Sequence, residues 1–121
     1  MYVANTSCPA AADLDTWSSH AWTNGLQIET LPNLETLSVR TCNSTYEITV
    51  LTPWTGEILV QGGQFFPTRT RARLAGASLG GSFLKQRGIY VGFRMELQDQ
   101  ERTIVTTEVQ SIGRVGDERV Q

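Results

Sequence analysis

Short runs of alternating apolar and polar residues, separated by turn residues, dominate residues 34–112. A period of two residues is typical of β-strands that bury one face and expose the other. In the first run, Leu37 and Val39 fall on one face and Arg40 on the opposite face. No run in this region has the length and spacing of an amphipathic helix, so the sequence predicts an all-β fold.

Turn residues mark where the predicted strands end. Pro53-Trp54-Thr55-Gly56 suits a type I turn in which glycine supplies a positive φ, and Cys42-Asn43-Ser44 and Gly62-Gly63 also predict turns. Residues 76–81 resemble a flexible connection, and residues 109–112 a short 3₁₀ turn. The predicted strands cover residues 34–41, 45–51, 57–61, 89–97 and 102–108, with one more inside residues 65–74.

Six short antiparallel strands with one apolar face would leave two exposed edges in a flat sheet. Closure into a barrel, or pairing of edges between subunits, removes that exposure. We therefore expect a small, strongly bent antiparallel β-barrel over residues 26–113, with the long strand at 89–97 bent and shared between its two halves. Residues 1–25 are expected to form a mostly irregular N-terminal tail or docking segment, and residues 114–121 a polar C-terminal tail.

The chain has 121 residues and a formal net charge of −2, which suits one small domain and lacks a strongly basic nucleic-acid footprint. Cys8 and Cys42 lack metal-ligand spacing, and His20 is the only histidine, so neither a metal nor another cofactor is expected. The cysteines are expected to be free thiols in a cytoplasmic protein. No apolar run reaches membrane-spanning length, so no membrane contact is expected.

One strand face carries a basic cluster. Arg69, Arg71 and Arg73 alternate, so they share a face at a spacing of roughly 6.6–6.8 Å, close to the phosphate repeat of an extended nucleic-acid strand. With Lys85 and Arg87 they are the candidate nucleic-acid-binding residues. The alternative is an exposed strand face that pairs with carboxylates on neighbouring strands, with Glu47, Glu57 and Glu96 as the candidates.

No catalytic constellation accompanies this pattern. A serine, threonine or cysteine nucleophile needs a base beside it, and His20 lies in the segment expected to be irregular. The paired glycines at 62–63 and 80–81 follow no phosphate-binding pattern. The sequence therefore predicts that the protein is not an enzyme.

Four stretches carry a family resemblance: TCNSTY at 41–46, GGQFFP at 62–67, LAGASLGGS at 74–82 and RGIYVGFRMEL at 87–97. Together they resemble uncharacterised small bacterial or phage proteins that are grouped, at fold level, with Sm-like small β-barrels. Arg87-Gly88 is similar to the Arg-Gly pair of the Sm family, whereas that family's Asp-x-Asn signature is absent. The resemblance implies a strongly bent barrel, assembly into rings, and binding of single-stranded RNA.

Two functions remain open from the sequence. The first is a non-enzymatic small β-barrel that self-assembles into a homo-oligomer and serves as a structural or interaction module. The second is an Sm-like oligomeric binder of single-stranded nucleic acid, which would use the arginine-lined strand face. An enzyme or small-ligand barrel is a third reading that lacks a base or metal set.

Overall fold

The computed structural model describes residues 24–79, 84–100 and 102–115, and strands account for most of them. These residues include no α-helix, which confirms the predicted all-β class, and no helix that could span a membrane. The tails predicted at 1–25 and 114–121 lie almost wholly outside the described residues. The elements are β1 (Gly25–Gln27), a 3₁₀ turn η2 (Ile28–Thr30), β2 (Thr36–Thr41), β3 (Thr45–Thr52), β4 (Glu57–Gly62), β5 (Phe66–Ser78), β6 (Leu84–Gln86), β7 (Gly88–Tyr90), β8 (Arg94–Asp99) and β9 (Arg102–Arg114).

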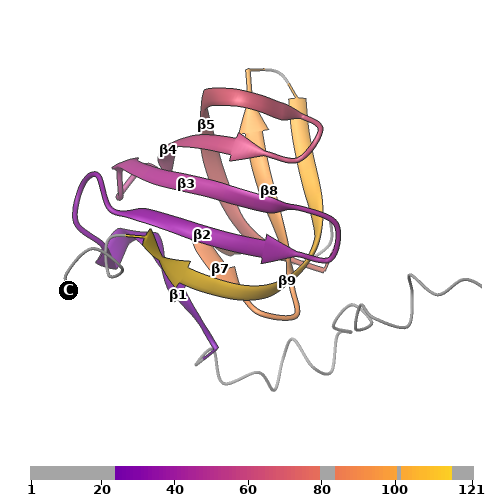
Figure 1. The fold of residues 1–121 in the computed structure, drawn as a ribbon. Helices are drawn as coiled ribbons and strands as arrows, with labels where there is room; N and C mark the ends of the chain where they lie inside the picture. The colour runs from indigo at the N-terminus through magenta and orange to yellow at the C-terminus, as the bar shows by residue number, and fades with distance from the viewer. Residues whose placement is uncertain (1–23, 80–83, 101, 116–121) are drawn as a thin grey trace, which may run out of the picture.

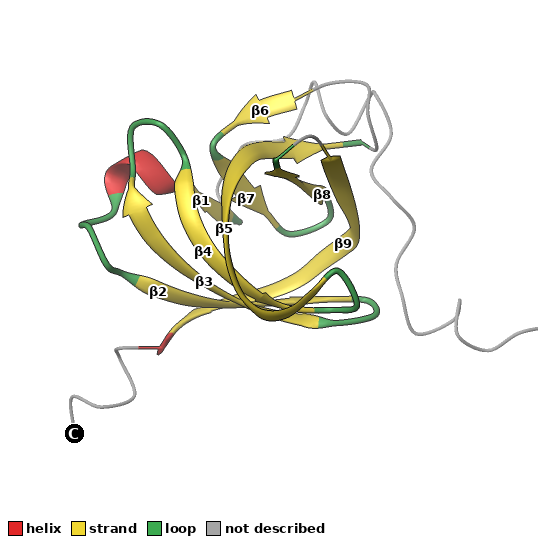
Figure 2. Ribbon diagram, turned by 90° about the horizontal axis from the view of Figure 1, so that it is seen from above, coloured by secondary structure: helices red, strands yellow, loops and turns green. Residues whose placement is uncertain are grey.

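The antiparallel sheet rings round on itself (Figures 1 and 2). Hydrogen-bonded neighbours follow the order β4-β3-β2-β9-β8-β5, and β5 also pairs with β4, so the circuit of pairings returns to its start. β6 adds to the far part of β5, while β1 and β7 form a separate two-stranded sheet. The prediction that the sheet closes on itself is confirmed, because its strand pairings form a complete circuit.

The two longest strands, β5 and β9, close the ring because each changes partner along its length. The first part of β5, up to Arg73, pairs with β4, and the part from Arg73 onward pairs with β8. Likewise β9 pairs with β8 up to Glu108 and with β2 from Val109 onward. A strand that leaves one partner and joins another must bend, so these two strands form the corners of the ring (Figure 2).

The prediction of one long bent strand at residues 89–97 is wrong. The structure divides this run into β7 and β8, and Gly92 between them has a φ of +92°. Phe93 N donates to Tyr90 O at 3.1 Å, so the chain turns where the alternating pattern continues. A glycine reaches this backbone conformation without the steric cost of a Cβ, and the bent strands are β5 and β9 instead.

The connection predicted at residues 76–81 is also corrected. Gly76, Ala77 and Ser78 continue β5 and are buried, whereas residues 80–83 lie outside the description. Gly76 has a φ of +150°, and a Cβ there would collide with the backbone carbonyl of Lys85 on β6. Small residues that resemble a loop in composition therefore allow two strands to approach closely.

The C-terminal 3₁₀ turn predicted at residues 109–112 is replaced by regular strand. β9 runs through to Arg114, with a register shift opposite Arg40 and Thr41 on β2. The predictions for the short strands and the turn between them are confirmed. β2, β3 and β4 lie where strands were predicted, and Gly56 has the positive φ, +85°, that its turn requires.

The core fills the inside of the ring with side chains from nearly every strand. Alternation places one face of β2, β3 and β4 inward, and β5, β7 and β8 supply the opposite wall. Burial of large apolar side chains contributes roughly 1.5–3 kcal/mol each. The largest fully buried side chains are Phe66, Phe93, Ile28, Leu37, Ile48, Ile58, Leu74, Ile89, Met95, Leu97, Val39 and Val50.

Candidate interaction surfaces

The predicted arginine face is real, and carboxylates partly neutralise it. Arg69 and Arg71 are exposed on β5, and Nη2 of Arg71 lies 3.2 Å from Oε1 of Glu57 on β4. Nη2 of Arg69 reaches across β4 to β3, where it lies 3.7 Å from Oε1 of Glu47 and 3.4 Å from Oγ1 of Thr49. Two of the three carboxylates proposed as cross-strand partners are therefore confirmed.

Arg73 and Arg87 extend this face onto a second region of the fold. A Cβ built on Gly56 would lie 3.5 Å from Cγ of Arg73 and 3.6 Å from Cγ of Arg87, so both side chains pass the same turn. Nε of Arg87 lies 3.4 Å from Oε1 of Glu29, without the alignment of a hydrogen bond. Lys85 lies on β6, which pairs with the far part of β5.

Two buried carboxylates on β8 and β9 are held by arginines. Glu108 on β9 accepts a hydrogen bond from Arg94 Nη2 at 3.0 Å, and Asp99 lies 2.6 Å from Nη2 of Arg102 across the β8–β9 turn. Burial of a carboxylate is costly unless a cation and hydrogen bonds compensate it. These pairs therefore stabilise the β8–β9 hairpin.

Two tyrosines have raised pKa values. Burial raises the pKa of Tyr46, although a hydrogen bond with Ser44 opposes the shift. Burial also raises the pKa of Tyr90, and the nearby Glu29 charge adds to it. The Tyr90 hydroxyl donates to Oε1 of Gln27 at 3.0 Å, which ties β7 to β1. Within the described ranges no group of three or more histidine, cysteine or acidic side chains is placed to hold a metal ion.

Each half of β9 has one edge without a strand partner among the described residues. The first half pairs only with β8, and the second half only with β2. The unpaired edges lie on opposite sides of β9, because β2 and β8 flank it on opposite sides. An unpaired edge presents backbone N–H and C=O groups that can hydrogen-bond an added strand.

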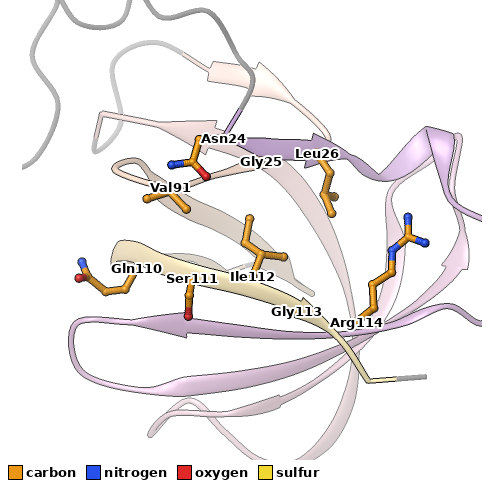
Figure 3. A pocket seen from close by; sticks show the side chains of 9 residues that line it. All are labelled: Asn24, Gly25, Leu26, Val91, Gln110, Ser111, Ile112, Gly113 and Arg114. Atoms are coloured by element: carbon orange, nitrogen blue, oxygen red, sulfur yellow. The ribbon is translucent and has the colours of Figure 1, made fainter. Parts of the chain in front are cut away.

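The unpaired edge of the second half forms one wall of a slot whose other wall is β1 (Figure 3). We call this cavity of about 510 Å³ the β1–β9 slot. Leu26 on β1 and Ile112 on β9 point toward one another across it, and Val91 lies at one end. β1 pairs only with β7, so its edge toward the slot also has no described partner. The slot is lined by Asn24, Gly25, Leu26, Val91, Gln110, Ser111, Ile112, Gly113 and Arg114.

The unpaired edge of the first half lines a smaller hollow of about 340 Å³. Tyr46 and Phe65 lie on the facing side, and the guanidinium of Arg102 lies 5.8 Å from the centre of the Phe65 ring. Phe65 and Val105 are partly exposed there. This hollow has the smaller volume and Phe65 lines it, so the β1–β9 slot is the better candidate site for an extended chain.

Cys42 lies beside the slot, and its sulfur is in a disulfide. The expectation of a free thiol is therefore wrong for Cys42, and Cys8 lies outside the described residues. Nε2 of Gln110 lies 3.5 Å from Sγ of Cys42. Disulfides persist mainly in oxidising compartments; the cytoplasmic location expected from the sequence stays a prediction.

Comparison with known proteins gives no match: no family model fits the chain, and no curated protein and no solved structure is significantly similar to it.

Sequence reasoning located the arginine face and missed the β1–β9 slot. The slot depends on β9 changing partner at Glu108 and Val109, and on β1 pairing with β7 across a long loop of sequence. Both are long-range pairings that strand periodicity does not reveal. Residues 109–112 carry no period of two, since Val109 and Ile112 are three apart, so local pattern gave no signal that β9 continues through them.

Proposed function

We propose that this chain is a non-enzymatic small β-barrel that self-assembles as an interaction module. Assembly occurs when an extended segment of a second copy adds to the free strand edges in the β1–β9 slot. The observation that carries the proposal is the slot itself, because two strand edges without described partners face each other across it, with Leu26, Val91 and Ile112 among polar lining residues. Strand addition of this kind is a common mode of peptide recognition.

The chemistry of the slot supports an extended chain as its occupant. Strand edges offer backbone hydrogen bonds, which are independent of the sequence of the added strand. Leu26, Val91 and Ile112 offer apolar contacts to alternate side chains of such a strand. A small domain also buries a limited share of its surface, so covering a free edge stabilises it.

The pairing of the buried acids supports a role other than catalysis. Glu108 and Asp99 are each engaged by an arginine, an arrangement suited to holding β8 against β9. A general acid or base instead needs access to a substrate proton. Among the described residues that line it, the β1–β9 slot has no aspartate, glutamate, histidine or cysteine.

We also infer that the ring is an Sm-like small barrel. The closed circuit of antiparallel pairings and the two bent corner strands support this inference. The circuit has six strands among the described residues, whereas Sm-like barrels have five. The proposed likeness is therefore one of closure and bending.

Sedimentation velocity over a range of protein concentrations tests self-assembly at the slot, under oxidising and under reducing conditions because Cys42 adjoins it. Leu26→Trp should fill the slot, since Leu26 points across it toward Ile112 (Figure 3). Val105→Phe, in the first half of β9 and outside the slot lining, is the matched control. Wild type and the control should associate with rising concentration under at least one condition, and Leu26→Trp should not. A wild type that stays monomeric throughout, or a Leu26→Trp variant that associates equally, contradicts the proposal.

Binding of single-stranded nucleic acid is the second candidate function. The convergence of Arg73 and Arg87 at Gly56 supports it, because it extends the Arg69–Arg71 row onto a neighbouring region. The ion pairs to Glu47, Glu57 and Glu29 weigh against it, since they offset the positive charge that attracts phosphates.

Fluorescence anisotropy with labelled single-stranded RNA and DNA separates this candidate from the first. Binding that weakens steeply with salt, and that is lost in an Arg69/Arg71/Arg73→Ala variant, supports a phosphate track. Unchanged anisotropy at micromolar protein and low salt rules it out.

A further inference from the structure

We propose that Arg73 and Arg87 form a binding site for the phosphate group of a small phosphomonoester, on the surface where the β3–β4 turn, β5 and the β6–β7 turn meet. Neither arginine lines the β1–β9 slot, so the site is independent of the proposed assembly. It also differs from a nucleic-acid track along β5, because it takes one doubly charged group and not a row of singly charged ones.

Backbone hydrogen bonds bring the two arginines together. The carbonyl of Gly56 in the β3–β4 turn accepts from Leu74 N at 2.8 Å, which places this turn beside Arg73. Arg87 N donates to the carbonyl of Ala75 at 2.9 Å, so the β6–β7 turn adjoins the next residue of β5. A Cβ built on Gly56 would lie 3.5 Å from Cγ of Arg73 and 3.6 Å from Cγ of Arg87. Both side chains therefore pass the same point of the surface.

Arg87 is held in a backbone conformation that few residues with side chains adopt. Its φ of +57° lies in the left-handed region, which is uncommon for residues other than glycine. Its N–H is bonded to Ala75, and its carbonyl accepts from Ile28 N at 2.9 Å. Such strained residues persist where the surrounding structure fixes them, and they cluster at functional sites. The fold therefore determines where the Arg87 side chain begins.

Arg73 is exposed and has no carboxylate within ion-pairing distance among the described residues, although one lies on the neighbouring strand. Glu57 on β4 is its cross-strand neighbour. Oε1 of Glu57 instead accepts hydrogen bonds from Arg71 Nη2 at 3.2 Å and from Thr52 Oγ1 at 3.1 Å. The neighbour on the other side, Gln98 on β8, is uncharged. The positive charge of Arg73 is thus available to an anion from solution.

Glu29 offsets only part of the charge of the Arg73–Arg87 site. Its Oε1 lies 3.4 Å from Arg87 Nε without hydrogen-bond alignment. Both carboxylate oxygens of Glu29 also accept from Gln27 Nε2, each at 3.2 Å. The Arg87 side chain remains 29% exposed. Two guanidinium groups and one carboxylate leave a net positive charge, which a bound anion would neutralise.

The number of charges selects the class of ligand. A carboxylate has two oxygens and one charge, which a single guanidinium fork satisfies. A phosphomonoester carries about −1.5 to −2 charge at pH 7 and three acceptor oxygens, so it can engage two forks at once. The phosphates of a nucleic-acid backbone carry one charge each and suit a row of cations. Arg69 and Arg71, which would extend such a row, are already paired with carboxylates.

Isothermal titration calorimetry of the full chain at low ionic strength tests the site, with adenosine 5′-monophosphate, inorganic phosphate and adenosine as the probes. Wild type should bind the two phosphate compounds and not adenosine. Arg73→Gln should weaken binding of the monophosphate about tenfold or more, because it removes one of two charged donors. Arg40→Gln is the matched control: it removes the same charge from an exposed arginine on β2 and should change the affinity less than about twofold.

Two further variants test the partner side of the site. Arg87→Gln should also weaken binding about tenfold or more. Glu29→Gln should strengthen it about twofold or more, since it removes the carboxylate that competes for Arg87. Far-UV circular dichroism checks that each variant is folded, and Arg73→Gln and Glu29→Gln decide the test if Arg87→Gln is not. The proposal is overturned if wild type binds neither phosphate compound, if adenosine binds equally, if Arg40→Gln loses as much affinity as Arg73→Gln, or if Glu29→Gln binds more weakly.

An oligothymidylate without terminal phosphates, whose phosphates are all diesters, separates the site from a nucleic-acid track. Tighter binding of this oligomer than of the monophosphate, with equal losses in Arg69→Gln and Arg73→Gln, overturns the discrete site in favour of a track. Sedimentation velocity of Arg73→Gln should match wild type, because Arg73 lies outside the slot. Loss of phosphate binding with assembly intact therefore sinks only the phosphate site, and the reverse result sinks only the proposed function.

Discussion

Nη2 of Arg94 on β8 lies 3.0 Å from Oε2 of Glu108 on β9, and Glu108 is almost fully buried. The pair sits where β9 leaves β8 and turns toward β2, because Glu108 is the last β9 residue paired with β8. The other carboxylate oxygen, Oε1, lies 3.6 Å from the sulfur of Cys42. One buried ion pair thus fixes the corner of β9 beside both the disulfide and the slot.

Arg94→Met should destabilise the fold by roughly 1–3 kcal/mol, because it leaves the Glu108 carboxylate buried without its cation. Urea denaturation of wild type and variant measures the change in the free energy of unfolding. Arg71→Met is the matched control, since its ion pair with Glu57 is exposed and exposed pairs contribute about 0–1 kcal/mol. Equal losses in the two variants would contradict the role assigned to the buried pair.

Leu34→Asn should stabilise the protein by roughly 0.5–1 kcal/mol. Leu34 has a φ of +70°, a left-handed backbone conformation that is strained for leucine. Its side chain is 69% exposed and therefore buries little apolar surface. Asparagine tolerates this conformation better than leucine. Thermal and urea unfolding measure the gain; a loss of stability would mean that the Leu34 side chain makes a contact important to the fold.

Gly76→Ala should destabilise the protein by about 2 kcal/mol or more, since the new Cβ would meet the Lys85 carbonyl and the φ of +150° suits only glycine. Gly113→Ala is the control, because a Cβ there meets no atom within 4 Å, and it should change stability by less than about 0.5 kcal/mol. Paired urea titrations compare them, and similar stability in both variants would contradict the close β5–β6 approach.

Stability should fall as the pH rises above about 10, the ordinary pKa of tyrosine. The folded protein raises the pKa of Tyr46 and Tyr90, so their protonated forms are favoured in the native state. The unfolded chain loses these protons at a lower pH than the folded protein does. The stabilisation that the protonated tyrosines give the folded state is therefore lost as the pH rises through their folded pKa values. Urea titrations from pH 8 to pH 11 should show a shallower decline in Tyr46→Phe than in wild type; parallel declines would contradict the shift at Tyr46.

Local pattern predicted the parts of the fold that depend on local sequence. The alternation around Leu37, Val39, Ile48 and Val50 identified β2 and β3 with their inward faces, because burial of one face imposes a period of two. Pro53 and Gly56 identified the β3–β4 turn through their backbone preferences. The arginine row followed from the same periodicity.

The remaining features depend on contacts between distant segments. Gly92 interrupts an alternation that looks continuous from Ile89 to Leu97, since only the backbone φ distinguishes a turn from a strand there. Gly76 looks like part of a loop until Lys85 is placed against it. The slot and the disulfide at Cys42 likewise arise from pairings that no single stretch of sequence contains.

Hydrogen exchange at the backbone amides of residues 110–114 is the most direct test of the central claim, that the β1–β9 slot holds an added extended segment. The account predicts slower exchange of these amides in wild type than in Leu26→Trp, which fills the slot from the facing wall, with β4 amides at residues 57–62 unchanged between the two proteins. Equal exchange at residues 110–114 in both proteins would mean that the slot edge of β9 carries no added strand, and would contradict the account.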